Sequence, residues 1–284
     1  MLSTILFPSS FFDVSKVDED MALEYDAVCA GGNFRVILFG YDAWFNEGRL
    51  RLSARPEEDI YALYRGWMMK PEQYRDFYAQ LARRGIHLIT SPEMYETLHL
   101  FPRIYTMIQE DTAGILTFPL HAHIDVDEIK AHFKRFMVKD YVKSVKGTEL
   151  PAFFDETITQ ADFDRWMEVF YHYRGDLLTE GICVKEFLPL KHYGDRTNEY
   201  RVYYYDHEVI SVSRNSLQGN YTPEPPDSFI RKWRSLPSIF YTVDFAELED
   251  GSWKIIETGD GSVSGLSDGQ NYSSFFRQLY ICGN

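Results

Sequence analysis

The stretch from residue 241 to residue 265 constrains the fold most, because it contains two strand patterns joined by a tight-turn signal. Residues 239–248 form an apolar run that is typical of a buried strand, and residues 253–257 repeat the pattern. An Asp-Gly pair at 250–251 separates the two runs, and this pair is common in hairpin turns. The sequence therefore predicts a β-hairpin near the end of the chain.

Three acidic residues of this hairpin, Asp244, Glu257 and Asp260, are candidate metal ligands. Because side chains in a strand alternate with a period of two, Asp244 and Glu257 are expected on the same side of the hairpin. Asp260 follows in a loop flanked by glycines, where the backbone is free to turn. Carboxylate oxygens suit Mg²⁺, which shares its coordination sphere with phosphates. The alternative is a solvated hairpin with ordinary surface acids.

The composition bounds the class of protein. The chain has 284 residues, of which 45% are hydrophobic and 25% charged, as in globular proteins. Its formal net charge of −14 argues against a broad surface for nucleic acid or anionic membrane, since both need clustered Lys and Arg. No apolar run approaches the roughly 18 residues of a membrane span. The three cysteines show neither zinc spacing nor a disulfide framework, so we expect a cytoplasmic protein.

Strand and helix patterns alternate over residues 1–105, which predicts a small α/β domain. The first apolar run lacks a basic segment, so we interpret it as a strand and not as a signal peptide. A hairpin-like turn is expected at 46–48. The expected strands are 2–7, 34–40, 60–64 and 86–89, and the expected helices are 18–30, 71–84 and 91–98.

Arg65 lies in the motif Tyr64-Arg65-Gly66-Trp67, where a strand of the predicted domain ends. Ligand sites of open α/β sheets favour that edge, and a guanidinium can hold a carboxylate or phosphate through two hydrogen bonds. Arg65 is therefore a candidate substrate-binding residue. The alternative is that Arg65 pairs with a nearby acid and Trp67 packs in the core.

The middle of the chain carries a basic loop. Residues 106–120 are expected to form a linker, 125–133 a helix, and 135–139 the start of a strand. Lys139, Lys143 and Lys146 then fall within eight residues that end before a glycine. Such a loop suits contact with a polyphosphate, although the sequence matches no Walker A or G-x-G-x-x-G motif. An exposed basic loop without a ligand is the alternative.

The remaining elements place further charged residues on strands. A hairpin over 198–215 is expected to turn near Asp206-His207, with Glu199 and Arg201 on one face. A helix is expected at 159–174. The other expected elements are a strand at 182–190 that carries Lys185 and Glu186, a helix at 227–235 and a helix at 268–280.

The order of these parts resembles the ATP-grasp superfamily. A lysine-bearing strand and loop come first, then the strand with Lys185-Glu186-Phe187-Leu188, and then a Glu199-x-Arg201 strand and a strand that ends in Arg214-Asn215. The Asp244 and Glu257 strands come last. The first half resembles one branch common in phage and bacterial genomes, through Tyr64-Arg65-Gly66-Trp67 and Lys139-Asp-Tyr-Val-Lys143-Ser.

The resemblance implies an α+β (α/β) protein with the ATP-grasp fold and an N-terminal α/β pre-ATP-grasp domain. The implied boundaries are 1–105 for the N-terminal domain and 106–284 for the ATP-grasp domain. Within the latter, 121–190 would be the small subdomain that clamps ATP, and 191–284 the larger subdomain with the metal site. ATP would lie between these subdomains.

The resemblance also implies cofactors and roles. ATP and Mg²⁺ are the expected cofactors, with Mg²⁺ on Asp244, Glu257 and Asp260. Many relatives carry Glu-x-Asn as the last metal motif, whereas this chain has Gly259 at the third position and Asp260 after it. Lys139, Lys143 and Lys185 would contact the nucleotide, with Lys143 also catalytic. Residues 186–188 would bind adenine, Glu199 would contact the nucleotide, and Arg201 and Arg214 would act in catalysis.

An ATP-dependent ligase is the preferred function. Such an enzyme phosphorylates a carboxylate, and an amine or thiol attacks the acyl-phosphate. Its substrates would be small molecules or peptides, without nucleic acid or membrane, and a homodimer is common in the superfamily. The alternatives are an ATP-grasp phosphotransferase, a ligase that modifies a peptide or protein, a nucleotide-binding module without turnover, and a metal-dependent phosphoesterase.

Overall fold

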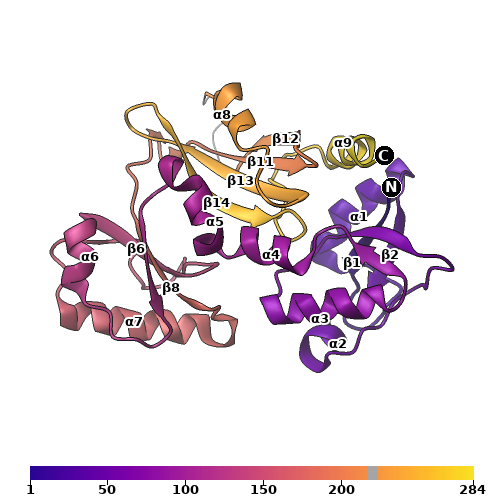
Figure 1. Cartoon of the computed structure of the whole chain (residues 1–284), viewed down its shortest axis with the longest axis horizontal. Coiled ribbons are helices and arrows are strands. Elements are labelled where there is room, and N and C mark those ends of the chain that lie inside the picture. The colour runs from indigo at the N-terminus through magenta and orange to yellow at the C-terminus, as the bar shows by residue number, and fades with distance from the viewer. Residues whose placement is uncertain (217–222) are drawn as a thin grey trace.

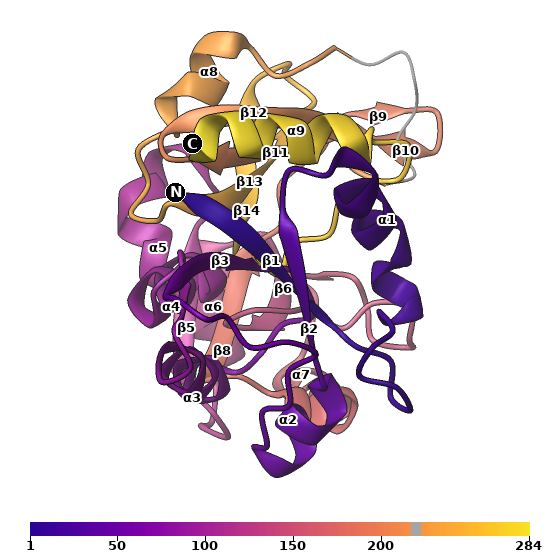
Figure 2. The ribbon, with the colours of Figure 1, turned by 90° about the vertical axis from the view of Figure 1, so that its right-hand side faces the viewer.

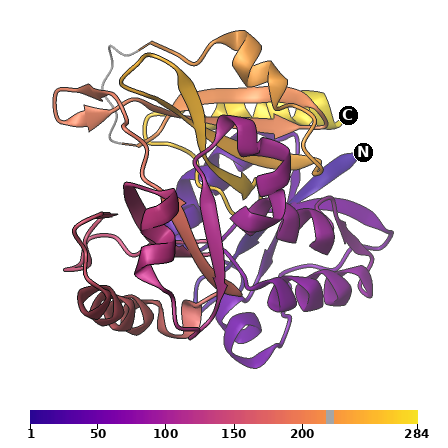
Figure 3. The ribbon, with the colours of Figure 1, turned by 60° about the vertical axis from the view of Figure 1, so that its left-hand side comes forward.

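The computed structural model describes residues 1–216 and 223–284. Within these ranges the chain forms three four-stranded sheets and one two-stranded ribbon. Figures 1 and 3 show an N-terminal sheet and a middle sheet on opposite sides of the molecule, with the C-terminal sheet between and above them. This is the mixed helix-and-sheet architecture that the sequence predicts. None of the described helices combines the length and the apolar character that a membrane span requires.

The N-terminal sheet is parallel throughout, with the strand order β2-β1-β3-β4. Its alternation of strands with helices follows the sequence pattern closely. The predicted turn at 46–48 is wrong, because these residues end a helix whose cap, Gly48, has a φ of 63°. The elements are β1 (Leu2–Pro8), η1 (Glu19–Met21), α1 (Ala22–Gly31), β2 (Arg35–Phe39), α2 (Tyr41–Glu47), β3 (Ile60–Tyr64), α3 (Pro71–Ala82), β4 (Ile86–Leu88) and α4 (Pro92–His99).

The middle sheet is antiparallel, with the strand order β5-β8-β6-β7. The prediction of a linker over 106–120 is wrong, because residues 115–119 form an edge strand paired with β8. The helices α6 and α7 pack on this sheet through an apolar cluster. The elements are α5 (Phe101–Ile108), η2 (Gln109–Asp111), β5 (Ile115–Pro119), α6 (Val126–His132), β6 (Arg135–Asp140), β7 (Phe154–Asp155), α7 (Gln160–Arg174), η3 (Gly175–Leu177) and β8 (Gly181–Glu186).

The C-terminal sheet is two hairpins side by side, in the order β12-β11-β13-β14. Both predicted hairpins are confirmed, with turns at 206–207 and 248–252. The elements are β9 (His192–Tyr193), β10 (Arg196–Thr197), β11 (Glu199–Tyr205), β12 (Glu208–Arg214), α8 (Asp227–Lys232), β13 (Phe240–Glu247), β14 (Trp253–Asp260) and α9 (Tyr272–Gly283).

The N-terminal and C-terminal sheets share one apolar core. Helix α9 packs against α1 and lies beside β12, and Figure 2 shows these segments together. One buried cluster joins Leu2 and Phe7 of β1 to Phe240 of β13 and Phe275 of α9. The side chain of Asn284 also donates a hydrogen bond to the Leu2 carbonyl, at 3.2 Å. The first strand and the last helix are therefore held together.

Candidate functional site

A cavity of about 400 Å³ lies between the middle sheet and the C-terminal sheet. Its walls come from β6, β8, β11, β13 and β14, which are far apart in the sequence. Apolar side chains at one end and ionic groups at the other make it suitable for a molecule with both characters. The structure brings ten predicted residues to this cavity: Lys139, Lys143, Lys185, Glu186, Phe187, Leu188, Glu199, Arg201, Asp244 and Glu257.

Lys139 and Glu257 face each other across this cavity. The ammonium of Lys139, on β6, lies 3.2 Å from a carboxylate oxygen of Glu257, on β14. Burial alone would raise the pKa of Glu257, but the charges of Lys139, Lys143 and Lys185 outweigh it and lower that pKa to about 2. The carboxylate is therefore ionised at neutral pH.

Lys185 is the most strongly perturbed cation of the cavity. Its ammonium donates a hydrogen bond to the Ile256 carbonyl at 2.5 Å and lies 3.9 Å from the centre of the Phe101 ring. Burial, together with the charge of Lys139, lowers the pKa of Lys185 to about 7. An anionic ligand in the cavity would favour the protonated form of Lys185.

A β-bulge aims Glu257 into the cavity. Asp244 pairs with Glu257 and Phe245 pairs with Ile255, so that Ile256 is an extra residue in β14. Bulges locally rotate a strand and redirect its side chains. As a result Ile256 and Glu257 both line the cavity, and Asp244 lies directly opposite Glu257. The predicted common face of the two carboxylates is confirmed.

Arg201 is fixed against Asp244 by two parallel hydrogen bonds. Its Nε and Nη2 atoms donate to the two carboxylate oxygens at 2.8 and 2.7 Å. Its Nη1 atom donates to the Gly265 carbonyl at 2.9 Å. Asp244 and Glu257 are hard oxygen ligands on adjacent strands at one wall of the cavity, and this donor set fits a magnesium ion bridged to phosphates.

The prediction that Asp260 completes the metal site is wrong. Beyond the bulge the alternation of β14 turns Asp260 to the opposite face of the sheet, where it pairs in register with Tyr241. Its carboxylate is fully buried, accepts a hydrogen bond from the Ser262 N–H at 2.9 Å, and has a pKa that burial raises to about 7. Within residues 1–216 and 223–284 no group of three His, Cys, Asp or Glu side chains could hold a metal ion.

The prediction that Arg214 joins Arg201 in the cavity is also wrong. Arg214 pairs with Tyr200, whereas Arg201 pairs with Ser213 and Asp244. Cross-strand partners share a face, so Arg214 lies on the other side of the sheet from Arg201. Asn215, one residue later, lines the cavity instead. The pattern of alternation could have favoured Asn215, but the residue type favoured Arg214.

Arg65 is a structural residue rather than an open substrate ligand. Its guanidinium is 2% exposed and donates to both oxygens of Glu24 on α1, at 2.7 and 2.8 Å. It also donates to the carbonyls of Gly261 and Ser264, the latter at 2.9 Å. The prediction that Arg65 binds substrate is therefore wrong, and its alternative, pairing with an acid, is what the structure shows.

The segment 186–188 borders the apolar end of the cavity. The N–H groups of Glu186 and Phe187 already donate to the Gly114 and Arg135 carbonyls, both at 2.9 Å. The N–H of Leu188 has no acceptor among the residues that the structure describes. It is the one backbone donor of the three that a nucleotide base could still use. The apolar residues missed by the sequence analysis are Met137, Leu190 and Ile256.

A second cavity, of about 80 Å³, adjoins the first and shares Lys143, Arg201, Asp244 and Glu257 with it. The N-terminal half contributes Met68 and His99 to its walls. Burial, with the charge of Lys143, lowers the pKa of His99 to about 3, so its imidazole is neutral. No sequence motif marks His99, because only the packing of α4 on β14 brings it there.

Solved structures share this fold across nearly the whole chain. D-alanyl-alanine synthetase A from Vibrio cholerae O1 biovar eltor str. N16961 matches with a TM-score of 0.60 and 12% identity, over 98% of this chain and 97% of that one. The ATP-grasp ligase PsnB, solved with a minimal precursor, Mg and ADP, matches with a TM-score of 0.60 and 11% identity, over 99% and 98%.

The macrocyclase MdnC from Microcystis aeruginosa MRC, bound to the precursor peptide MdnA, gives a TM-score of 0.58 and 12% identity, over 98% and 99% of the two chains. A sequence search of curated proteins finds no match. The model of one family of ATP-grasp domains, family 3 of its clade, matches residues 128–279, which is more than half of the chain. The predicted superfamily is thereby confirmed, and the chain belongs to this family of ATP-grasp domains.

Proposed function

We propose that this protein is an ATP-dependent ligase that joins a carboxylate to an amine or thiol through an acyl-phosphate. The observation that carries the proposal is the cavity of about 400 Å³, in which Lys139, Lys143 and Lys185 face the carboxylates Asp244 and Glu257. Three ammonium groups and a two-carboxylate wall suit a magnesium polyphosphate, and the apolar end suits a nucleobase. The family supports the same assignment.

Each cavity residue has a distinct task in this proposal. Lys139 and Lys143 bind phosphate oxygens, and Lys185 binds a phosphate next to the base. Asp244 and Glu257 hold Mg²⁺, which would neutralise the charge that develops on the phosphates during transfer. Arg201 stabilises the transferred phosphoryl group and is positioned for it by Asp244. Glu199 and the Leu188 N–H bind the nucleoside.

The reaction proceeds in two displacements. A carboxylate oxygen of the substrate attacks the γ-phosphorus of ATP, and the bond to the β-phosphate oxygen breaks to release ADP. The amine then attacks the acyl carbon, inorganic phosphate leaves, and the amine loses a proton. These steps need positioning and charge neutralisation from the protein rather than a covalent nucleophile.

The substrates are peptides or small molecules in this proposal. Solved structures of the same fold include a ligase and a macrocyclase bound to precursor peptides, and a synthetase of D-alanyl-alanine. The small cavity beside Met68 and His99 opens on the phosphate end, so it is a suitable place for the group that accepts the acyl.

Thermal unfolding with ATP tests the nucleotide site. We expect ATP with Mg²⁺ to raise the melting temperature of the wild type, because a ligand of the folded state stabilises it by mass action. The increase should be lost in Glu257→Ala. Candidate amino acids and peptides are then screened for release of ADP. Absence of any shift with millimolar ATP or ADP would overturn the proposed function.

A further inference from the structure

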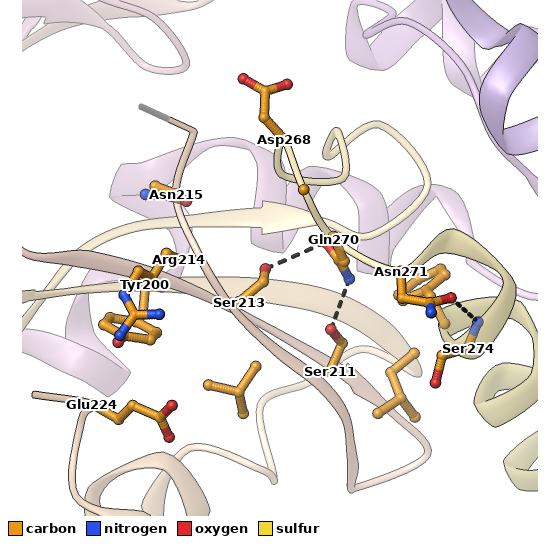
Figure 4. Close-up of a pocket in the computed structure, with 14 residues that line it drawn as sticks. Tyr200, Ser211, Ser213, Arg214, Asn215, Glu224, Asp268, Gln270, Asn271 and Ser274 are labelled. Atoms are coloured by element: carbon orange, nitrogen blue, oxygen red, sulfur yellow. Dashed lines mark hydrogen bonds between the residues drawn. The ribbon is translucent and has the colours of Figure 1, made fainter. Parts of the chain in front are cut away.

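A polar groove of about 470 Å³ runs along β12, outside the cavity assigned to ATP (Figure 4). Every residue from 210 to 215 lines it. Since neighbouring side chains of a strand point to opposite faces, such a run means that the groove follows the edge of the strand. The facing wall is the segment 268–271 with the first turn of α9, and Glu224 closes one side. We call this feature the β12 groove.

The edge of β12 presents backbone groups to this groove. Strand β12 is the outer strand of its sheet and pairs with β11 alone among the described strands. The Asn215 N–H donates to the Glu199 carbonyl on β11, at 3.0 Å. Because successive residues of an antiparallel strand alternate between their two neighbours, the N–H and C=O of Val212 point away from β11. Val212 is 39% exposed, and these two groups have no partner within the part of the chain that the structure describes.

The polar side chains of the groove are held in place. Gln270 donates to the Ser211 hydroxyl at 2.7 Å and accepts from the Ser213 hydroxyl at 3.3 Å. Figure 4 shows the Asp268 carboxylate on one side of these residues and the Glu224 carboxylate on the other. Both acids are exposed, in a chain whose net charge is −14. The groove is therefore complementary to an extended chain with basic side chains.

The β12 groove is continuous with the ATP cavity. Asn215 lines both, and it lies at the end of β12 on the same face of the sheet as Arg201. A chain laid along β12 can therefore bring one of its groups to the phosphate end of the cavity.

We propose that the β12 groove binds an extended peptide segment with Lys or Arg side chains, which adds to the sheet as a strand beside β12. Backbone hydrogen bonds to Val212 supply affinity, and Glu224 and Asp268 select the basic side chains. The segment belongs to the ligase substrate, whose reacting group it guides past Asn215. This inference rests on the proposed function and narrows its substrate to a basic peptide.

Two fluorescein-labelled peptides test the proposal: an acetylated ten-residue repeat of Thr-Lys and its Thr-Glu counterpart. Their binding to the full chain is measured by fluorescence anisotropy at 150 mM salt. Val212→Pro removes the outward N–H but leaves the pairing with β11, a position at which edge strands tolerate proline. Val212→Thr is the matched control, since it keeps the N–H and the strand propensity.

We expect the Thr-Lys peptide to bind the wild type and Val212→Thr at least tenfold more tightly than Val212→Pro. We also expect it to bind the wild type at least tenfold more tightly than the Thr-Glu peptide, and Glu224→Gln with Asp268→Asn to reduce that preference. The stabilisation by ATP should be unchanged in all variants, and its loss in the wild type would count against the proposed function instead.

Equal affinity of Val212→Pro and wild type, or no binding of the Thr-Lys peptide while ATP still binds, would overturn the peptide assignment alone. A dimer in light scattering that Val212→Pro dissociates would also overturn it, because the edge of β12 would then belong to a second copy of the chain.

Discussion

Two buried ionic clusters lie on opposite faces of the same strand β14, and they differ in what their charges meet. In the cavity cluster, Lys139 and Lys185 face Glu257 beside an open volume of about 400 Å³. In the clamp cluster, Arg65 meets Glu24 and the carbonyls of the segment 261–264, next to the buried Asp260.

The two clusters show how similar residues serve different ends. The clamp cluster satisfies the Arg65 guanidinium with protein acceptors, so nothing is left for a ligand. The cavity cluster holds three like charges near one carboxylate, an arrangement that lowers the pKa of Lys185 and leaves ammonium protons facing the cavity. An excess of one sign at a cavity wall indicates ligand binding, whereas a balanced and enclosed pair indicates architecture.

Breaking the clamp cluster should have the largest effect on stability. Arg65→Met leaves the Glu24 carboxylate buried without its partner and removes the donors to Gly261 and Ser264. Losing one partner of a buried pair costs about 3–5 kcal/mol of unfolding free energy. Urea denaturation measures the difference, with Arg65→Lys as a control that keeps the charge. A loss below about 1 kcal/mol would mean that the pair is not structural.

The pH dependence of stability should separate Asp260 from the cavity carboxylates. The folded pKa of Asp260 is raised from 3.8 to about 7, so its stabilising contribution is full below pH 4 and is lost as the pH rises to about 7. Asp260→Asn keeps the acceptor for Ser262 and should therefore equal the wild type at pH 4. At pH 8 it should be more stable, on the order of 3 kcal/mol.

Urea denaturation at both pH values measures this difference. Asp250→Asn is the control of opposite sign, because hydrogen bonds from Ser252 lower the pKa of Asp250, and its contribution is lost as the pH falls. A variant Asp260→Asn that loses the stabilisation by ATP and Mg²⁺ would contradict the placement of Asp260 outside the metal site.

Removing one ammonium from the cavity cluster should affect activity and leave stability intact. We expect Lys139→Met to lower ADP release about 100-fold, or about 2.7 kcal/mol, because a phosphate loses its cation. The free energy of unfolding should change by less than about 1 kcal/mol, since Lys143 and Lys185 still face Glu257. Lys134→Met, at an exposed position before the same strand, is the control. A stability loss as large as that of Arg65→Met would remove the contrast between the clusters.

Proton uptake on nucleotide binding is the smallest expected effect. Lys185, with a pKa of about 7, is mostly neutral at pH 8, and the charge of ATP would favour its protonation. Calorimetric titration in HEPES and in Tris should show uptake of up to about one proton at pH 8 and less at pH 6. Lys185→Met should abolish the difference between buffers. Equal uptake in this variant would assign the proton to another group.

Sequence pattern was sufficient where local signals decide the structure. Alternation and turn residues placed both hairpins of the C-terminal sheet, and hence the pairing of Asp244 with Glu257. The bulge at Ile256 has no local signal, because an extra residue is visible only once both strands are in register. The positions of Asp260 and Arg214 depended on such register, and both predictions failed.

Other errors came from ambiguous local signals. The turn predicted at 46–48 is a helix end, because Asn-Glu-Gly fits a helix terminus as well as a hairpin. The strand at 115–119 is short and ends in proline, so only its pairing with β8 identifies it. His99 and Asn215 enter the cavities through packing of distant elements, which no spacing in the sequence encodes.

The contact of β1 with α9 has a mechanical consequence for nucleotide exchange. Because the chain ends are held together and share a core, the two outer sheets behave as one body. The middle sheet is then an insertion into that body, which the backbone enters once after η2 and leaves once after β8. A body attached by two backbone connections can turn about them as about a hinge. ATP and ADP can therefore exchange while the outer sheets, with Asp244 and Glu257, stay in place.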